Sequence, residues 1–107
     1  MINNISGGVW ATSSVSETPE ITLTNWAVLE LPDGDRHFAG FNVTEYEGRA
    51  SSKIVTFDKD TMRGVTRTGR VYELYGRPGL SGDGLYTWNR WCSLNNIVEF
   101  KNMSEAL

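Results

Sequence analysis

Segments in which apolar and polar residues alternate run from residue 21 to residue 75, separated by short stretches of turn-forming residues. Alternation with a period of two predicts half-buried β-strands. The connections are too short for the crossovers that parallel neighbours need, so the strands are expected to form an antiparallel meander. The predicted strands cover residues 21–31, 36–43, 52–57, 62–67 and 70–75.

The first two of these segments carry the strongest local signal, because the residues between them form a turn. Pro32 presets φ for a turn, Asp33 caps its own backbone, and Gly34 accepts a positive φ. A β-hairpin over residues 21–43 is therefore predicted.

The periodicity changes after a glycine-rich stretch at 76–82, which ends the sheet. Asp83 is placed to act as the N-cap of a helix over residues 84–94. Leu85, Trp88 and Cys92 fall at helical spacing and predict its buried face. The predicted fold class is α+β, an antiparallel β-meander of about five strands with one C-terminal α-helix packed on one face.

The chain length of 107 residues fits a single domain. We place that domain at residues 21–100, with a last short strand at 97–100. Residues 1–20 are expected to form an N-terminal edge strand around 8–10 and a polar arm, and residues 101–107 a tail.

Composition narrows the class of protein. The hydrophobic content of 39% and the net charge of −3 exclude a wholly disordered chain. The longest strictly apolar run, residues 26–29, is far short of a membrane span, and the first residues lack the features of a secretory signal. Cys92 is the single cysteine, so no internal disulfide is available. We therefore expect a cytoplasmic protein with no membrane contact.

The small net charge conceals a segregation along the sequence. Residues 1–48 hold seven carboxylates and one arginine (−6), residues 49–77 seven cations and three carboxylates (+4), and residues 78–107 add −1. The acidic and basic segments either face each other on neighbouring strands or serve a charged partner.

Residues that could support catalysis are sparse. His37 and Cys92 are the only histidine and cysteine, and we expect a half-buried strand histidine and an inert core thiol. Structural zinc needs four such ligands, and the aspartates at 33–35 and 58–60 fit turns better than calcium loops. The stretch 76–84 lacks the ending of a phosphate-binding loop. We therefore predict no enzyme, no cofactor and no metal.

A basic ribbon with an aromatic residue is the most distinctive candidate surface. Arg63 and Arg67 alternate onto one face of the fourth strand, and Arg70 and Tyr72 share a face of the fifth beyond a Thr68-Gly69 turn. Arg67 opposite Arg70 would require an anionic neighbour, since like charges repel across a ladder. The candidate interaction residues are Arg63, Arg67, Arg70 and Tyr72, or alternatively an acidic rim at Glu45 and Glu47.

The tryptophans supply large apolar surfaces for a core or an interface. Trp26, Trp88 and Trp91 are expected to form the core between sheet and helix, with Trp10 closing an edge. Trp10 and one of the others are also candidate surface anchors, because tryptophan and arginine dominate interface energetics.

The residues Thr-Arg-Thr-Gly-Arg-Val-Tyr-Glu-Leu-Tyr-Gly-Arg-Pro-Gly at 66–79, followed by Trp-Asn-Arg-Trp at 88–91, resemble a group of short uncharacterised bacterial proteins. That group is carried on phages, plasmids and integrated elements. The resemblance implies a small accessory protein of a mobile element, a class that often blocks host machinery, as anti-CRISPR proteins do. It carries over no functional residues.

These observations lead to two hypotheses for function. The first is a non-enzymatic protein-interaction module of a bacterial mobile element, with inhibition of a host defence complex as its role. The alternative is a single-stranded nucleic-acid-binding β module that uses the Arg/Tyr ribbon. A protein partner is expected, nucleic acid stays open, and so does a homo-oligomer.

Overall fold

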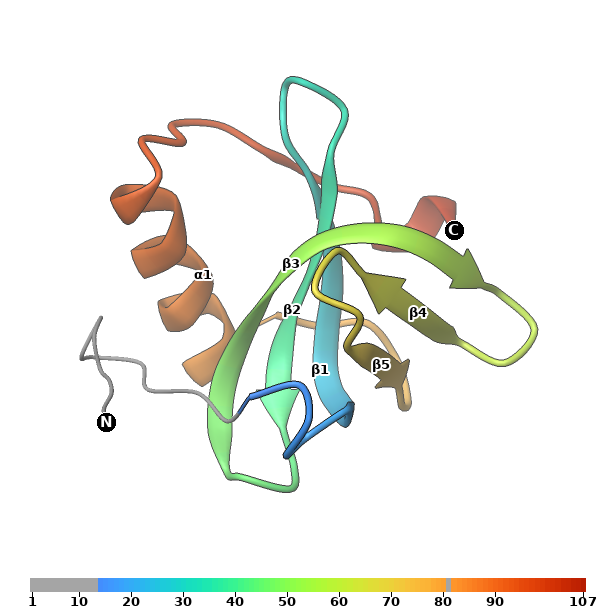
Figure 1. The fold of residues 1–107 in the computed structure, drawn as a ribbon. Coiled ribbons are helices and arrows are strands. Elements are labelled where there is room, and N and C mark those ends of the chain that lie inside the picture. Colours follow the sequence, from blue (N-terminus) through green and yellow to red (C-terminus); the bar gives the residue numbers. More distant parts are fainter. Residues whose placement is uncertain (1–13, 81) are drawn as a thin grey trace.

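The computed structural model describes residues 14–80 and 82–107 and arranges the predicted strands around a barrel, with one helix on the outside (Figure 1). The predicted N-terminal strand at 8–10 and Trp10 lie outside the described residues. The elements are β1 (Glu20–Glu30), β2 (Arg36–Asn42), β3 (Glu47–Asp58), β4 (Arg63–Thr66), β5 (Val71–Leu74), α1 (Asp83–Leu94), β6 (Lys101–Asn102) and a 3₁₀ turn, η3 (Ser104–Ala106).

The α+β class, the single helix and the antiparallel meander from β1 to β5 are confirmed, but the open sheet is wrong because the sheet closes on itself. The first half of β1 pairs in parallel with β5, through Glu20↔Val71 to Leu23↔Leu74. Its second half pairs antiparallel with β2. In a meander of five strands the first and the fifth run in the same direction, so closure is parallel and needs no separate crossover.

Two bulges keep apolar side chains inside the closed barrel. The β1–β2 register shifts between Thr24 and Ala27, where Asn25 adopts a positive φ of 49°. The shift changes the phase of the alternation, so that Leu23 and Trp26 both face inward. A second shift, in β3 between Ile54 and Thr56, places Ile54 and Phe57 against the same core.

The barrel interior is the larger apolar core. Phe38 is completely buried, with its ring centroid 5.5 Å from that of Tyr72 and 5.9 Å from that of Phe57. The buried members are Ile21, Leu23, Trp26, Val28, Phe38, Tyr72 and Leu74. Trp26, expected between sheet and helix, thus lies inside the barrel instead, where its Nε1 donates to the Gly76 carbonyl at 3.0 Å.

The helix α1 is confirmed and packs on the outer surface of β2 and β3 (Figure 1). Glycines let the backbones approach closely. A Cβ on Gly84 would lie 2.9 Å from the Gly40 Cα, and one on Gly48 would collide with the Asp83 carbonyl. This docking rotates the helix away from the predicted face, so that Leu85 is exposed while Gly84, Thr87, Trp88 and Cys92 are buried.

Asp83 does not act as the N-cap of the helix, contrary to the prediction. It is the first helical residue, and Gly82 precedes it with a positive φ of 59° and no side-chain cap hydrogen bond. An acidic residue in the first turn still opposes the positive end of the helix dipole.

The C-terminal residues, predicted as a tail, belong to the fold. Residues 97–100 are irregular, and the short strand comes just after them as β6, which pairs with the end of β1. The Ser104 hydroxyl then accepts a hydrogen bond from the Val28 amide at 2.9 Å. Leu107 packs against the barrel core. The closed barrel provides the surface on which residues 101–107 pack, and no local pattern in these residues predicts that packing.

None of the helices within the described ranges has the length and apolar character to cross a membrane.

Candidate binding site

The β4–β5 hairpin decides where the predicted basic ribbon lies. The Thr66 amide donates to the Arg70 carbonyl at 3.0 Å, and Val65 pairs with Val71. The loop therefore has three residues, with Gly69 at a φ of 92°, as in hairpins that end in a glycine bulge. The prediction that Arg67 faces Arg70 is wrong, because the register of the two strands is displaced by one residue. Such a slip exchanges the two faces of a strand.

The ribbon residues consequently separate onto two sides of the barrel. Arg63 points outward and pairs with Glu20 and, at 3.6 Å, with Glu73. Arg70 is buried, and its Nε donates to the Thr18 carbonyl at 2.9 Å. Tyr72 lies in the barrel core. The structure therefore leaves Arg67 as the exposed arginine of this set that has no ion pair among the described residues.

The acidic rim is occupied by a buried arginine. Arg49 is 4% exposed, and its Nη1 lies 3.4 Å from Glu47 Oε2 and 3.8 Å from Glu45 Oε1. Its Nε donates to the Tyr72 hydroxyl at 3.3 Å. Burial raises the pKa of Tyr72, and the charge and hydrogen bond of Arg49 oppose that rise. Glu45, Glu47 and Tyr72 thus form one internal network, not two separate surfaces.

Internal pairing accounts for much of the charge segregation along the sequence. Cations from the basic segment meet carboxylates of the acidic segment, but the pairs lie within β3 and the turn before it, between β3 and the β1–β2 turn, and between β4 and β1, which are not neighbouring strands. The pairs are Arg49 with Glu45 and Glu47, Arg63 with Glu20, and Lys53 with Asp35 at 3.3 Å.

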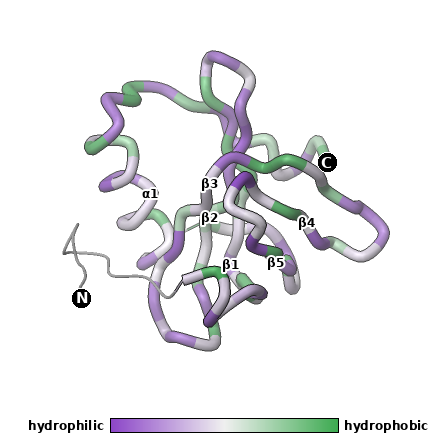
Figure 2. The backbone as a smooth tube through the Cα atoms, viewed as in Figure 1, coloured by the Kyte–Doolittle hydropathy of each residue, from purple (hydrophilic) through white to green (hydrophobic). Residues whose placement is uncertain are grey.

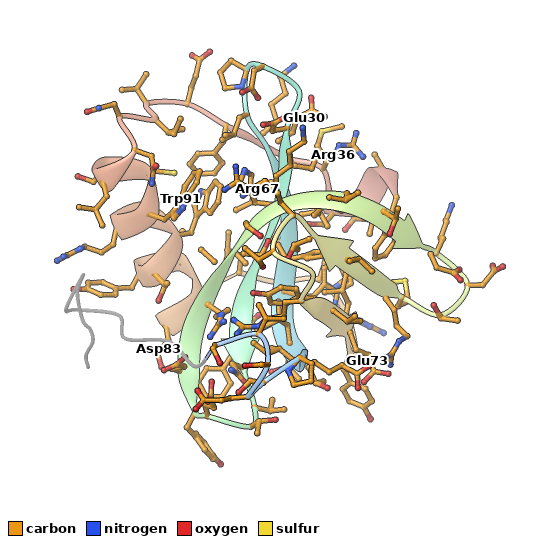
Figure 3. All side chains as sticks on the ribbon, in the orientation of Figure 1. Glu30, Arg36, Arg67, Glu73, Asp83 and Trp91 are labelled. Atoms are coloured by element: carbon orange, nitrogen blue, oxygen red, sulfur yellow. The ribbon has the colours of Figure 1, made fainter. Side chains whose placement is uncertain are left out.

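Arg67 lies instead at a cavity of about 380 Å³ between α1 and the barrel. Figure 3 shows Arg67 and Trp91 extending into the same region from different elements. The walls come from the end of the β1–β2 hairpin, the middle of β3, the β4–β5 loop and the last turn of α1. The lining residues are Leu31, Asp35, His37, Ala50, Ser51, Ser52, Lys53, Arg67, Trp91 and Asn95. We call this the Trp91 cavity.

His37 forms part of the inner wall of the Trp91 cavity. The side chain is 5% exposed, more deeply buried than was expected, because α1 covers this face of β2. Its Nδ1 donates to the Ser51 carbonyl at 2.9 Å, and no described residue hydrogen-bonds to its Nε2. The ring centroid lies 4.7 Å from that of Trp91. The hydrogen bond fixes the ring and leaves one nitrogen as a polar group of the wall.

Trp88 and Trp91 form the aromatic layer behind His37, as the helical pattern predicted. Their rings stack with centroids 5.0 Å apart, and Trp88 also meets Phe100 edge-on at 5.4 Å. Trp88 is completely buried, and its Nε1–H has no hydrogen-bond partner among the described residues. Cys92 is buried in the same layer, which confirms a core thiol, and burial raises the pKa of the thiol.

Three exposed apolar residues, which we call the apolar strip, lie at the end of α1 and on the segment after it. Leu94 is 64% exposed, Val98 94% and Phe100 38%. Figure 2 shows hydrophobic colour on the connection between α1 and the C-terminal strand. Leu31 lines both the Trp91 cavity and a neighbouring cavity of about 260 Å³ that includes Phe100, so the two cavities are adjacent.

The sequence does not reveal that Arg67 and Trp91 line the same cavity, since they are 24 positions apart and belong to different elements. Within residues 14–80 and 82–107 there is no cluster of three His, Cys, Asp or Glu side chains that could hold a metal ion. Comparison with family models, curated proteins and solved structures finds no match for this chain.

Proposed function

We propose that the chain is a non-enzymatic protein-interaction module that binds its partner through the Trp91 cavity and the strip of Leu94, Val98 and Phe100. The observation that carries this proposal is exposed Arg67, which has no ion pair among the described residues and lines the same cavity as the half-buried indole of Trp91. Arginine and tryptophan next to apolar surface are the residues that concentrate binding energy in protein interfaces.

The charges of the cavity favour a carboxylate from the partner. Two cations, Arg67 and Lys53, line it against one carboxylate, that of Asp35, which already pairs with Lys53. A carboxylate that meets Arg67 gains charge-assisted hydrogen bonds. The exposed strip next to it favours apolar side chains flanking that carboxylate.

The wider role follows the resemblance to proteins of bacterial mobile elements. We propose that the partner belongs to the host and that binding inhibits it, with a defence complex as the first candidate. This role places the protein in the bacterial cytoplasm.

Single-stranded nucleic acid is the second candidate. The indole of Trp91 beside Arg67 offers a place for a base to stack with a phosphate nearby. The predicted Arg/Tyr ribbon does not form one surface for this alternative, since Arg70 and Tyr72 are buried. Binding of this kind would weaken steeply with salt.

The test is capture of a partner from a bacterial lysate treated with nuclease, using the intact chain and three variants. Arg67→Glu reverses the charge at the cavity, and Val98→Asp places a charge on the apolar strip. Arg77→Glu is the matched control, because Arg77 is also exposed and has no ion pair among the described residues.

We expect a stoichiometric protein that the intact chain and Arg77→Glu retain, and that Arg67→Glu and Val98→Asp lose at least tenfold. A partner held equally by all four proteins would overturn the proposed surface. Oligonucleotide binding that Arg67→Glu abolishes, with no captured protein, would establish the second candidate instead. Capture of the chain by its own second copy would show a homo-oligomer and also contradict the proposal.

A further inference from the structure

A second cavity lies next to the Trp91 cavity and shares Asp35 and Lys53 with it. Its volume is about 430 Å³, within the range of roughly 300–1,000 Å³ usual for small-molecule sites. We call it the barrel-mouth cavity. The lining residues include Asp35, Lys53, Ile54, Phe57, Lys59 and Leu107.

The cavity exists because β3 changes its neighbour along its length. Its pairing with β2 ends at His37↔Lys53, and from Ile54 onward β3 pairs with β4. β2 and β3 diverge at this point, and Leu107 of the C-terminal segment packs beside the gap between them. The resulting gap reaches the barrel core between residues of β1, β2, β3 and the C-terminal segment.

The inner wall of the barrel-mouth cavity is apolar and its rim is basic. Ile54, Phe57 and Leu107 are half-buried and pack on the barrel core. The rim carries three cations and one carboxylate. Arg36 is held by Glu30 at 2.8 Å and Lys53 by Asp35, whereas exposed Lys59 has no ion pair among the described residues.

We propose that the barrel-mouth cavity binds a small amphiphile, a single apolar chain that ends in a carboxylate. The chain would lie against Ile54, Phe57 and Leu107, and the carboxylate would meet Lys59. Charge complementarity supports this assignment, since Lys59 has no ion pair among the described residues, whereas the other two cations of the rim are paired with carboxylates. Each methylene of the ligand that the apolar wall removes from water increases the affinity of the cavity for that ligand.

The test is titration of the isotope-labelled full chain with decanoate and octanoate, followed by nuclear magnetic resonance. We expect decanoate to shift signals of Val28, Ile54 and Leu107 and to leave the indole signal of Trp91 unchanged. Decanoate should bind up to about fifteenfold more tightly than octanoate, because each buried methylene contributes about fourfold. Shifts centred on Trp91, or none in the barrel mouth, would overturn the assignment.

Three variants separate the two parts of the site. Lys59→Glu should weaken decanoate about three- to tenfold and leave decanol, which has no charge, unaffected. Thr56→Trp, at an exposed lining position, should block both ligands. Lys101→Glu is the control, because Lys101 is exposed and lies outside this cavity. Equal weakening by Lys59→Glu and Lys101→Glu would contradict a specific contact with Lys59.

The proposed partner surface and the proposed ligand cavity can be tested separately. Arg67→Glu should leave decanoate binding unchanged, and Thr56→Trp should leave capture of the protein partner unchanged. Loss of decanoate binding in Arg67→Glu would contradict two separate sites.

Discussion

The interior of the barrel and the layer beneath α1 are built from the same strands but differ in chemistry. Along β1, Val28 points into the barrel while Leu29 points to the helix. The interior is mainly apolar, and its buried polar groups are paired: Arg49 donates to the Tyr72 hydroxyl, and Arg70 donates to the Thr18 carbonyl. The helix layer contains His37, a half-buried Trp91 and the Trp88 N–H, which has no hydrogen-bond partner in the described part of the chain, and the layer opens onto a cavity.

This contrast teaches how a small chain can separate stability from binding. A barrel closed on itself satisfies its strands without the helix, so the outer layer is free to carry polar and exposed groups. We therefore expect substitutions inside the barrel to act on stability, and those at the opening of the helix layer to act on binding.

The largest expected effect comes from emptying the barrel interior. Phe38→Ala should lower the free energy of unfolding by about 3–5 kcal/mol, because it removes a completely buried aromatic ring and leaves a cavity. Chemical denaturation measures this change. Val55→Ala, on an exposed position of β3, should cost less than about 1 kcal/mol. Similar losses for both variants would refute the interior as the main source of stability.

A smaller effect should follow from disturbing the contact between helix and barrel. Gly48→Ala places a methyl group against the Asp83 carbonyl and should cost about 1–3 kcal/mol through overpacking. The near-ultraviolet circular dichroism of the stacked Trp88 and Trp91 should change with it. Ser93→Ala, at an exposed position of α1, is the control and should change stability by less than about 0.5 kcal/mol. A Gly48→Ala protein with unaltered spectrum and stability would rule out this close approach.

The smallest effect concerns alkaline pH. Tyr72 has its pKa raised above the usual value of 10.0 by burial, so the folded state holds the proton more tightly than the unfolded chain. Its contribution to stability is complete below pH 10 and is lost as pH rises through the higher pKa of the folded state. Denaturation between pH 8 and pH 11 should show this loss, and Tyr72→Phe should reduce it. An identical slope in both proteins would contradict a raised Tyr72 pKa.

Local signals predicted the elements better than the contacts between them. The hairpin over residues 21–43 and the helix after residue 82 followed from turn residues and periodicity alone. Closure of the sheet did not, because it pairs β1 with β5 over about 50 positions, and no local pattern encodes such a contact. The C-terminal segment was predicted as a tail for the same reason.

Only the residue types of the candidate site could be predicted from the sequence, and not their arrangement. Arg67 and the tryptophans stood out by residue type, but the surface built from Arg63, Arg67, Arg70 and Tyr72 depended on the register of one hairpin. A third loop residue displaced that register and turned Arg70 and Tyr72 inward. Arg67 and Trp91 come to line one cavity because the helix docks on the barrel, which the glycines at 40, 48 and 84 permit.

The most direct test of the proposed division between structure and binding is hydrogen exchange of the chain, free and bound to the captured partner. Amides at 66–70 and 91–100 should exchange more slowly in the complex, while those around Glu45 and Glu47 should not change. Protection limited to residues 43–49, with none at 91–100, would place the interface on the acidic rim and contradict the account.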